Sequence, residues 1–406
     1  MKIIKNGCVT TPIGFKAGGF GCGIKKEGLD LGMIYSEIPA ATAIMATTNI
    51  VKAAPILWCK EVMKNPVKQT VIVNSGNANA CTGEQGMTDV LATAKKVGEV
   101  LGIEPESVLV ASTGVIGLPL PVGKILSGIE SLVPILGFSE EDGLSAATAI
   151  LTTDTMIKTV GVEIEIQGVT VKIGGMAKGS GMIHPNMATM LSFVTTDVAI
   201  EVDVLQDLLN ETTIDSYNMI SVDGDTSTND MVTVMANGMA GNIKLKKNAP
   251  DFEIFKEAFI YVHKSLAKQI IRDGEGATKF LEVNVRGAKT KEDARTLAKS
   301  VVTSSLVKTA MFGEDANWGR VLCALGYSGA IFDPLKVSLV FSSQIGMITL
   351  LNDGFPIAFD EAEAKKVLSE TDIIITVELQ EGYEKAVAWG CDLSYDYVKI
   401  NGDYRS

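Results

Sequence analysis

A glycine-rich segment with a His-Pro turn leads to a threonine that directly follows a small alanine. Residues 178–190 read KGSGMIHPNMATM, and the pair is Ala188 and Thr189. A threonine hydroxyl held against the preceding carbonyl can take over the acyl group, and water can then hydrolyse the ester. Cleavage would give Thr189 a free α-amine, with a pKa of about 8, that can serve as base for its own hydroxyl. Such glycine, proline and asparagine clusters also mark plain surface loops before a strand.

Two other segments place hydroxyl and glycine residues directly after an apolar strand. The first, residues 70–83, reads TVIVNSGNANACTG and leads into a predicted helix at 84–101. The second, residues 107–117, reads SVLVASTGVIG and contains Thr113 and Gly114. A Thr-Gly pair after a strand can direct a hydroxyl and a backbone N–H to one point, as an oxyanion hole requires. From these residues alone, an ordinary strand-to-helix turn remains the simpler interpretation of both segments.

The composition favours a globular enzyme that acts on a small molecule. The 406 residues are 46% hydrophobic and 21% charged, which allows a sizeable core and two or three domains. The net charge of −12 disfavours a nucleic-acid partner. Six scattered cysteines without a CxxC pair, and only two histidines, predict neither a metal site nor a disulfide framework. We find no signal-peptide or membrane-span pattern and expect a cytoplasmic protein with no membrane partner.

Local patterns predict the elements that carry the candidate residues. Residues 139–151 begin with serine and an acidic turn, which indicates a capped helix. The runs at 159–166 and 169–177 alternate apolar and polar residues, so we expect a hairpin that delivers Lys178 to the glycine-rich segment. The nearly apolar run after Thr189 predicts a strand buried on both faces.

Four further features receive structural interpretations. His263 lies within a helix predicted at 251–272, and we expect it to be structural. The acidic loop in 219–230 lacks the glycine and terminal glutamate of an EF-hand, which argues against calcium. Glu275, between two glycines, resembles an exposed carboxylate on a flexible turn, and the polar tail is of a kind that usually frays.

Several separated strings, in one order along nearly the whole chain, resemble the ornithine acetyltransferase family, also called bifunctional glutamate N-acetyltransferases, of arginine biosynthesis. The similarity runs without a break through KGSGMIHPNMATML, residues 178–191. The other similar strings are VNSGNANACTG, the Thr113-Gly114 pair, TTDTMIK, VDGDTSTND, the GEGATK turn and KTAMFGEDANWGR.

This resemblance implies a role for individual residues. Thr189 would be the nucleophile of self-cleavage after Ala188 and of catalysis, with Thr113 and Gly114 as the oxyanion hole. The implied substrate-binding residues are Thr152 (with Thr153 as the alternative), Lys178, Thr189, Glu275, Asn401 and Ser406. Lys178 would hold a substrate carboxylate or lower the pKa of the Thr189 amine. Glu275 suits the side-chain ammonium of ornithine, and the C-terminus, with Asn401 and Ser406, would close over the site.

The implied reaction is a ping-pong acetyl transfer that needs no cofactor and no metal. Thr189 would take the acetyl group of N2-acetyl-L-ornithine, release ornithine and pass the group to L-glutamate, giving N-acetylglutamate. Some family members also accept acetyl-CoA as donor, and the sequence leaves open whether this chain does. The implied fold is α/β, with layered mixed sheets between helices (αββα-like), of a self-cleaving N-terminal-threonine nucleophile enzyme. Its alpha chain would be residues 1–188 and its beta chain residues 189–406, assembling as an α2β2 heterotetramer.

Two alternatives stay open at this point. A self-cleaving aminopeptidase or amidohydrolase of similar fold would hydrolyse its substrate without transfer to glutamate, although such enzymes typically expose a serine. An uncleaved amino-acid-binding protein would carry an inert Thr189. Two bands on a denaturing gel that split near residue 188 would exclude the binding protein.

Overall fold

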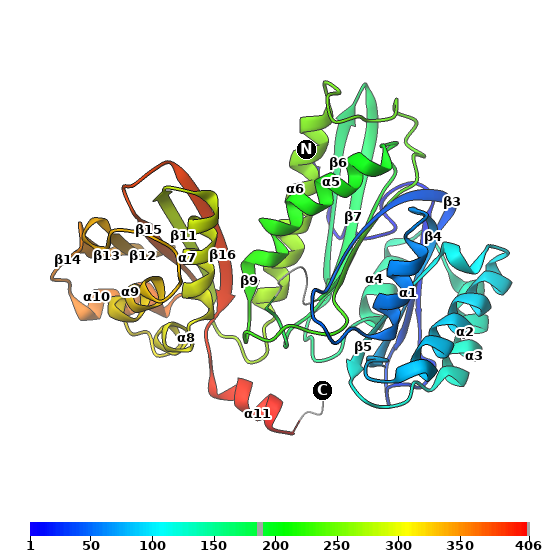
Figure 1. Ribbon diagram of the computed structural model, residues 1–406, viewed down its shortest axis with the longest axis horizontal. Helices are drawn as coiled ribbons and strands as arrows, with labels where there is room; N and C mark the ends of the chain where they lie inside the picture. The colour runs from blue at the N-terminus through cyan, green and yellow to red at the C-terminus, as the bar shows by residue number, and fades with distance from the viewer. Residues whose placement is uncertain (185–189, 404–406) are drawn as a thin grey trace.

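Two mixed β-sheets and the helices packed on them make up the fold (Figure 1). The computed structural model describes residues 1–184 and 190–403, so Ala188, Thr189 and Ser406 lie outside the described residues. The larger sheet has, in spatial order, β1 (Lys2–Ile3), β6 (Lys158–Ile166), β7 (Val169–Lys178), β8 (Leu191–Thr196), β10 (Met231–Ala236), β3 (Leu31–Ala46), β4 (Val67–Asn77) and β5 (Val108–Val115), with β2 (Phe15–Phe20) paired to β3. The prediction of mixed α/β layers is confirmed.

The predicted hairpin that leads to Lys178 is present as β6 and β7. The two strands pair antiparallel from Lys158 opposite Ala177 to Ile166 opposite Val169. The turn residues Gln167 and Gly168 have φ angles of 53° and 76°, the pattern of a two-residue turn that matches the twist of a hairpin. The end of β7 therefore has a defined position in the sheet.

The strand after the glycine-rich segment is buried on both faces, as the sequence predicts. All six residues of β8 are buried, and β8 runs antiparallel to β7 and parallel to β10. Leu191 and Phe193 pack into the apolar cluster on one side of the sheet, while Val194 packs into the cluster on the other side. Helices therefore cover both faces at this strand.

Helices cover both faces of the larger sheet. Helices α1 (Ala54–Val62), α2 (Gly83–Leu101), α3 (Val122–Leu132) and α4 (Glu140–Ala149) share one apolar cluster. Helix α3 packs against Gly18 and α4 against Gly19, and since successive residues of a strand point to opposite faces, these two helices lie on opposite faces of β2. Helices α5 (Val202–Ile214) and α6 (Phe252–Arg272) belong to the second apolar cluster. The predicted cap of α4 is confirmed, because Ser139 and Asp142 form a reciprocal capping box. His263, on α6, is buried with Nδ1 3.2 Å from the Tyr217 hydroxyl, which is the structural role expected for it.

The smaller sheet lies beside the larger one and is built mainly from the C-terminal part of the chain (Figure 1). Its strands, in spatial order, are β14 (Phe355–Pro356), β13 (Gly346–Asn352), β12 (Ser338–Ser343), β15 (Asp372–Glu378), β11 (Phe280–Ala288), β16 (Glu384–Cys391) and β9 (Ile220–Ser221). The helices associated with it are α7 (Lys291–Thr303), α8 (Ser305–Phe312), α9 (Trp318–Gly326) and α10 (Glu361–Ser369). Helix α11 (Tyr395–Asp403) then runs from this side towards the larger sheet.

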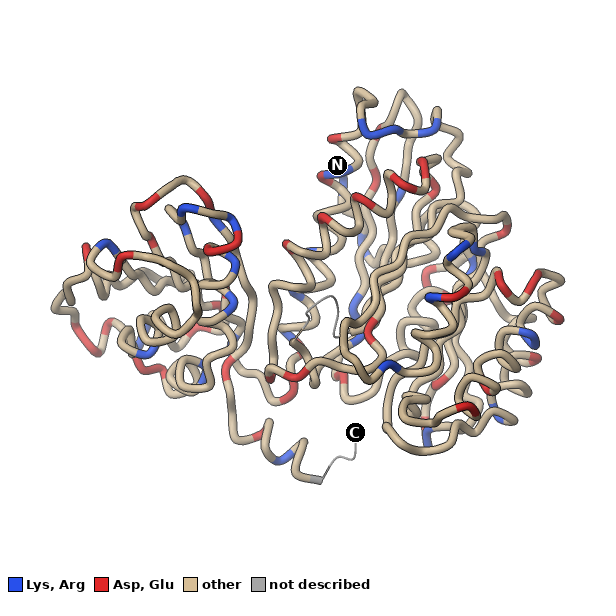
Figure 2. Tube along the Cα trace, in the orientation of Figure 1, with Lys and Arg blue, Asp and Glu red and all other residues tan. Residues whose placement is uncertain are grey.

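Charged residues of both signs are distributed along the helices and loops. Figure 2 shows acidic and basic residues interspersed along the outer elements, in keeping with a modest excess of acidic residues. Within the part of the chain that the structure describes, no helix is both long and apolar enough to cross a membrane.

Candidate active site

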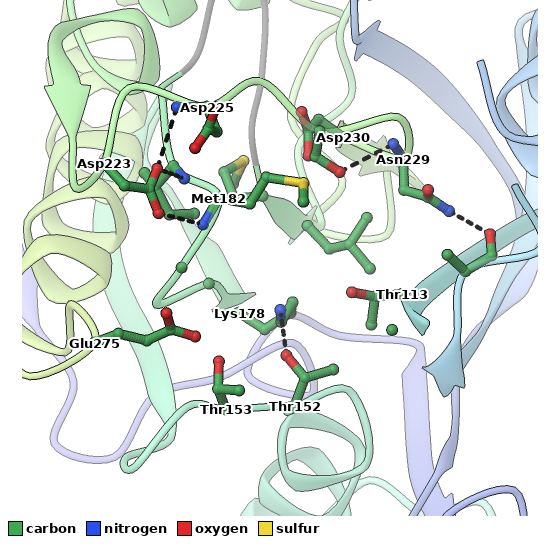
Figure 3. Close-up of a pocket in the computed structure, with 18 of the residues that line it drawn as sticks. Thr113, Thr152, Thr153, Lys178, Met182, Asp223, Asp225, Asn229, Asp230 and Glu275 are labelled. Carbon is green, nitrogen blue, oxygen red and sulfur yellow. Dashed lines mark hydrogen bonds between the residues drawn. The ribbon is translucent and has the colours of Figure 1, made fainter. Parts of the chain in front are cut away.

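One cavity of about 190 Å³ collects the predicted site residues that the structure describes. Its wall includes Thr113, Gly114, Thr152, Thr153, Lys178, Glu275 and Asn401. Met190, the residue after Thr189 in the chain, also lines it. Figure 3 shows the acidic loop before β10 along one side of this cavity, opposite Lys178, Thr152, Thr153 and Glu275. The predictions for Thr189 and Ser406 concern residues outside the described part of the chain.

The Thr113-Gly114 pair lies at the end of β5, directly beside the parallel strand β4. Gly114 has a φ of 127°, and a Cβ built on it would lie 2.4 Å from the carbonyl carbon of Gly76. No side chain fits there, so the close approach of the two strands requires glycine. The backbone of this pair is thereby fixed at the cavity wall, which an oxyanion hole needs.

Asparagine side chains hold the ends of β4 and β5 in place through hydrogen bonds. Asn229 Nδ2 donates to the carbonyl oxygens of Ala78, at 2.6 Å, and Ser112, at 2.8 Å. The Ser112 hydroxyl in turn donates to Asn74 Oδ1 at 2.6 Å. Asn229, Ser112 and Asn74 are all buried, so these bonds are protected from competition by water. The acidic loop before β10 is thus tied to the residue that precedes Thr113.

Lys178 reaches the cavity from the end of β7 and is held by two neighbours. Its Nζ donates to Thr152 Oγ1 at 2.8 Å and lies 3.6 Å from Asp154 Oδ2. Asp154 also accepts the backbone N–H of Gly179 at 2.6 Å. Thr153 contacts a different partner, because its hydroxyl lies 2.7 Å from that of Ser180. Both threonines line the cavity.

A buried ionic network that the sequence analysis missed supports Lys178. Lys158 Nζ lies 2.7 Å from Asp154 and 2.5 Å from Asp273, and none of the three side chains is more than 2% exposed. Burial alone would raise the pKa of Asp154, but Lys178 and Lys158 hold it below its ordinary value. An ionised Asp154 therefore fixes both the lysine and the chain that leaves β7. The i, i+4 spacing of Asp154 and Lys158 in TTDTMIK was the only local sign of this pair.

The expectation that Glu275 is exposed on a flexible turn is wrong. Glu275 is only 8% exposed, its backbone N–H bonds to Ser180, and its Oε2 accepts Asn401 Nδ2 at 2.7 Å. The reason is α11, which packs so closely that a Cβ on Gly276 would lie 2.5 Å from the Tyr397 nitrogen. The tail is therefore helical as far as Asp403 and contributes Asn401 to the cavity.

Asp223 anchors the glycine-rich segment through backbone bonds. Its carboxylate accepts the N–H of Met182 at 2.6 Å and of Ile183 at 2.9 Å. Burial, together with the nearby Asp223 carboxylate, raises the pKa of Tyr397, which keeps this phenol protonated at neutral pH. Tyr397 lines the cavity four residues before Asn401, a helical spacing that could have revealed it in the sequence.

His184 lies at the last described position before residues 185–189. Its Nδ1 is 3.1 Å from the Ser221 hydroxyl, and burial, aided by Lys299, lowers its pKa to about 4. Its imidazole is therefore neutral at pH 7. A neutral ring at this position is suited to hydrogen bonding and supplies no positive charge to the site.

Hydroxyl groups, a backbone held at a strand end, a lysine and several carboxyls surround one small cavity. This combination is typical of an enzyme that binds a small polar substrate and transfers or hydrolyses an acyl group.

Comparison with known proteins gives the family. The model of the ArgJ family matches residues 16–406. The arginine biosynthesis bifunctional protein ArgJ of Caldanaerobacter subterraneus is 54% identical over 403 residues, which cover 99% of this chain and 100% of that protein. The chain belongs to the ArgJ family.

Solved structures give two further similarities. A chain of the arginine biosynthesis bifunctional protein ArgJ from Bacillus halodurans is 49% identical, with a TM-score of 0.51, over 53% of this chain and 100% of its own length. A chain of the ornithine acetyltransferase of Mycobacterium tuberculosis, solved with ornithine, is 39% identical over 46% of this chain and 99% of its own length, with a TM-score of 0.44.

Proposed function

We propose that this enzyme transfers the acetyl group of N2-acetyl-L-ornithine to L-glutamate through an ester on Thr189, as a step of arginine biosynthesis. One observation carries the proposal. The Thr113-Gly114 backbone, Lys178 and Glu275, which come from distant parts of the chain, line one cavity together with Met190, in a member of the ArgJ family.

Each cavity group has a place in the proposed reaction. Lys178 binds the α-carboxylate of the amino acid, and Glu275 binds the side-chain ammonium of ornithine, with Asn401 holding its carboxylate in place. The hydroxyl of Thr189 attacks the acetamide carbon while its own α-amine takes the proton. The Thr113 hydroxyl and the Gly114 N–H stabilise the negative oxygen of the tetrahedral intermediate. Ornithine leaves, and glutamate accepts the acetyl group from the ester.

We further propose that the chain cuts itself between Ala188 and Thr189, giving an alpha chain of 1–188 and a beta chain of 189–406. The sheet topology supports an assembly that survives this cut. Strands β8 and β10 of the beta chain lie between β7 and β3 of the alpha chain, and their residues are buried. Separating the two chains would break two strand interfaces and expose the core, so they stay together.

Two proposals concern assembly and location. We expect two such cleaved protomers to associate as an α2β2 heterotetramer, which native mass measurement tests directly. We also place the enzyme in the cytoplasm, because all six cysteines are free, as is usual in a reducing compartment.

A second donor is favoured by the names of the relatives, which describe bifunctional proteins. Acetyl-CoA would form the same ester on Thr189 and would start the pathway as well as recycle its acetyl group. Formation of N-acetylglutamate from acetyl-CoA and glutamate, with acetylornithine absent, would establish this activity. Formation from acetylornithine alone would restrict the enzyme to recycling.

The test of the main proposal combines processing with transfer. Wild type, Thr189→Ala and the control Thr170→Ala are purified, and intact mass, N-terminal sequence and acetyl transfer from acetylornithine to glutamate are measured. Thr170 is exposed near the turn of the β6–β7 hairpin, so the Thr170→Ala variant should behave as wild type. We expect a chain that begins Thr-Met-Leu-Ser in wild type and in Thr170→Ala. In Thr189→Ala we expect neither cleavage nor acetyl transfer. Transfer by uncleaved wild type would refute the mechanism, and cleavage with hydrolysis alone would indicate an aminopeptidase.

A further inference from the structure

Asp230 is a buried carboxyl of the cavity wall with an oxygen left unpaired. Its residue is 3% exposed, and Oδ2 has no hydrogen-bond partner among the described residues. Asp230 immediately precedes β10, whose first N–H, that of Met231, bonds to the carbonyl of Met190 at 2.9 Å. The carboxyl is thereby placed beside the start of β8, where the cavity meets the described chain after Thr189.

A negative charge on this buried carboxyl is energetically unfavourable, because one of its oxygens has no hydrogen-bond partner in the described part of the chain. Burial raises the pKa of Asp230 well above its ordinary value, and the neighbouring Ser227 and the positive charge of Lys178 offset only part of this effect. A neutral carboxyl in the wall of a substrate cavity can release its proton when a cationic substrate binds, because the positive charge stabilises the carboxylate. The other titratable groups that line this cavity are Lys178, Asp223, Asp225, Glu275 and Tyr397.

These neighbouring carboxylates are already engaged or more open to solvent. Both oxygens of Asp223 accept backbone N–H groups, and Glu275 accepts the amide of Asn401. Asp225 is exposed, so its carboxylate remains hydrated. Asp230 alone, among the described residues of this wall, combines a buried side chain with an unpaired carboxyl oxygen.

The proposed reaction contains a proton that no assigned group handles. The α-amine of free glutamate is protonated at neutral pH, and an ammonium has no electron pair with which to attack an ester. The α-amine of Thr189 already carries the hydroxyl proton between threonine oxygen and substrate nitrogen. The surplus proton of the incoming ammonium therefore requires a second acceptor.

We propose that Asp230 is a further catalytic residue, which exchanges one proton with the α-amino group of the substrate in each half-reaction. This inference rests on the proposed function. In the first half, the acetamide nitrogen–carbon bond breaks, and the threonine proton moves to nitrogen. The neutral carboxyl of Asp230 then protonates the released amine, leaving a carboxylate paired with an ammonium. In the second half, the carboxylate takes one proton from the ammonium of glutamate, and the neutral amine attacks the ester. The products are N-acetylglutamate, free threonine hydroxyl and the neutral carboxyl, so the cycle balances.

The test compares two acceptors that compete for the same acetyl-enzyme. Glutamate arrives protonated, whereas hydroxylamine is largely neutral at pH 7 and needs no base before it attacks. Wild type, Asp230→Asn and the control Asp207→Asn, a surface position on α5, receive acetylornithine with both acceptors present. The ratio of N-acetylglutamate to acetohydroxamate is measured. This ratio depends on neither the cleaved fraction nor the rate of the first half-reaction.

We expect Asp230→Asn to lower the ratio about 100-fold or more, the usual size of general acid–base catalysis, with Asp207→Asn unchanged. An unchanged ratio in Asp230→Asn overturns the inference. Equal loss of both products also overturns it, because Asp230 would then serve folding, cleavage or ester formation. Asp230→Glu, which keeps a carboxyl, should restore part of the ratio. If wild type transfers acetyl to neither acceptor, the proposed function itself is wrong, and that outcome is separate from the others.

Discussion

Replacement of Gly114 by alanine should abolish most catalysis while leaving the substrate affinity nearly intact. The new Cβ would lie 2.4 Å from the Gly76 carbonyl carbon, whereas ordinary contacts begin at 3.4 Å. The difference, 3.4 − 2.4, requires the Thr113-Gly114 backbone to retreat by about 1.0 Å. The obstacle is backbone, so no side-chain rotation can relieve it.

A shift of this size removes the Gly114 N–H from the position of the oxyanion. Loss of one such donor lowers kcat about 100-fold to 1,000-fold, or about 2.7 to 4 kcal/mol. Since the donor acts in the transition state, kcat and kcat/KM should fall equally while KM changes little. The assay is steady-state acetyl transfer, normalised to the cleaved fraction by intact mass.

Gly117→Ala is the matched control for backbone strain. Gly117 has a φ of 80°, and nothing lies within 4 Å of the position that a Cβ would take, so alanine adds strain without a clash. It should cost about 1 kcal/mol in the free energy of unfolding and leave kcat near that of wild type. If Gly114→Ala matches Gly117→Ala in kcat, the oxyanion-hole assignment is refuted.

Three further predictions concern stability and positioning. Asp154→Asn leaves Lys158 partly uncompensated and should lower the free energy of unfolding by about 3 kcal/mol at pH 7 in urea titrations. The pKa of Asp154 is lower in the folded protein than in the unfolded one, so its contribution to the free energy of unfolding is complete above pH 3.8 and is lost as pH falls further. The difference in stability between wild type and Asp154→Asn should therefore narrow at the lowest pH. A difference that stays constant would contradict this. Burial lowers the pKa of His263 to about 3, so the free energy of unfolding should fall as pH drops below 6.5. The variant His263→Phe should make this dependence on pH shallower by about 1.4 kcal/mol per pH unit. An unaltered dependence would argue against a neutral buried imidazole. Asn229→Ala removes the donor to the Ser112 carbonyl, so it should lower kcat and should also lower the free energy of unfolding by about 2 kcal/mol. Loss of stability with an unchanged kcat would show that this hydrogen bond does not position Thr113.

Local sequence patterns were sufficient for the elements that carry the site. The hairpin at 159–166 and 169–177, the Ser139 cap and the buried strand after Thr189 each follow from period, turn residues or capping chemistry. Their outcome depends on neighbours within a few residues, which a single sequence displays directly.

The polar framework of the site depends on contacts between distant residues. Lys158 and Asp273 are 115 positions apart, so no local pattern announces their ion pair. The residues around Glu275 predict an exposed side chain, because the helix that covers it begins at Tyr395, far along the chain. Asp230 gives no sign of its burial, since the strands around it come from both halves of the chain.

The most direct test of the central claim is to trap the acetyl-enzyme. Cleaved wild-type protein is mixed with N2-acetyl-L-ornithine, quenched in acid, and the masses of its two chains are measured by mass spectrometry. We predict that the chain beginning at Thr189 gains one acetyl group on that residue, and that added L-glutamate removes it as N-acetylglutamate forms. Turnover without acetylation of this chain, or with the acetyl group on another residue, would contradict the account.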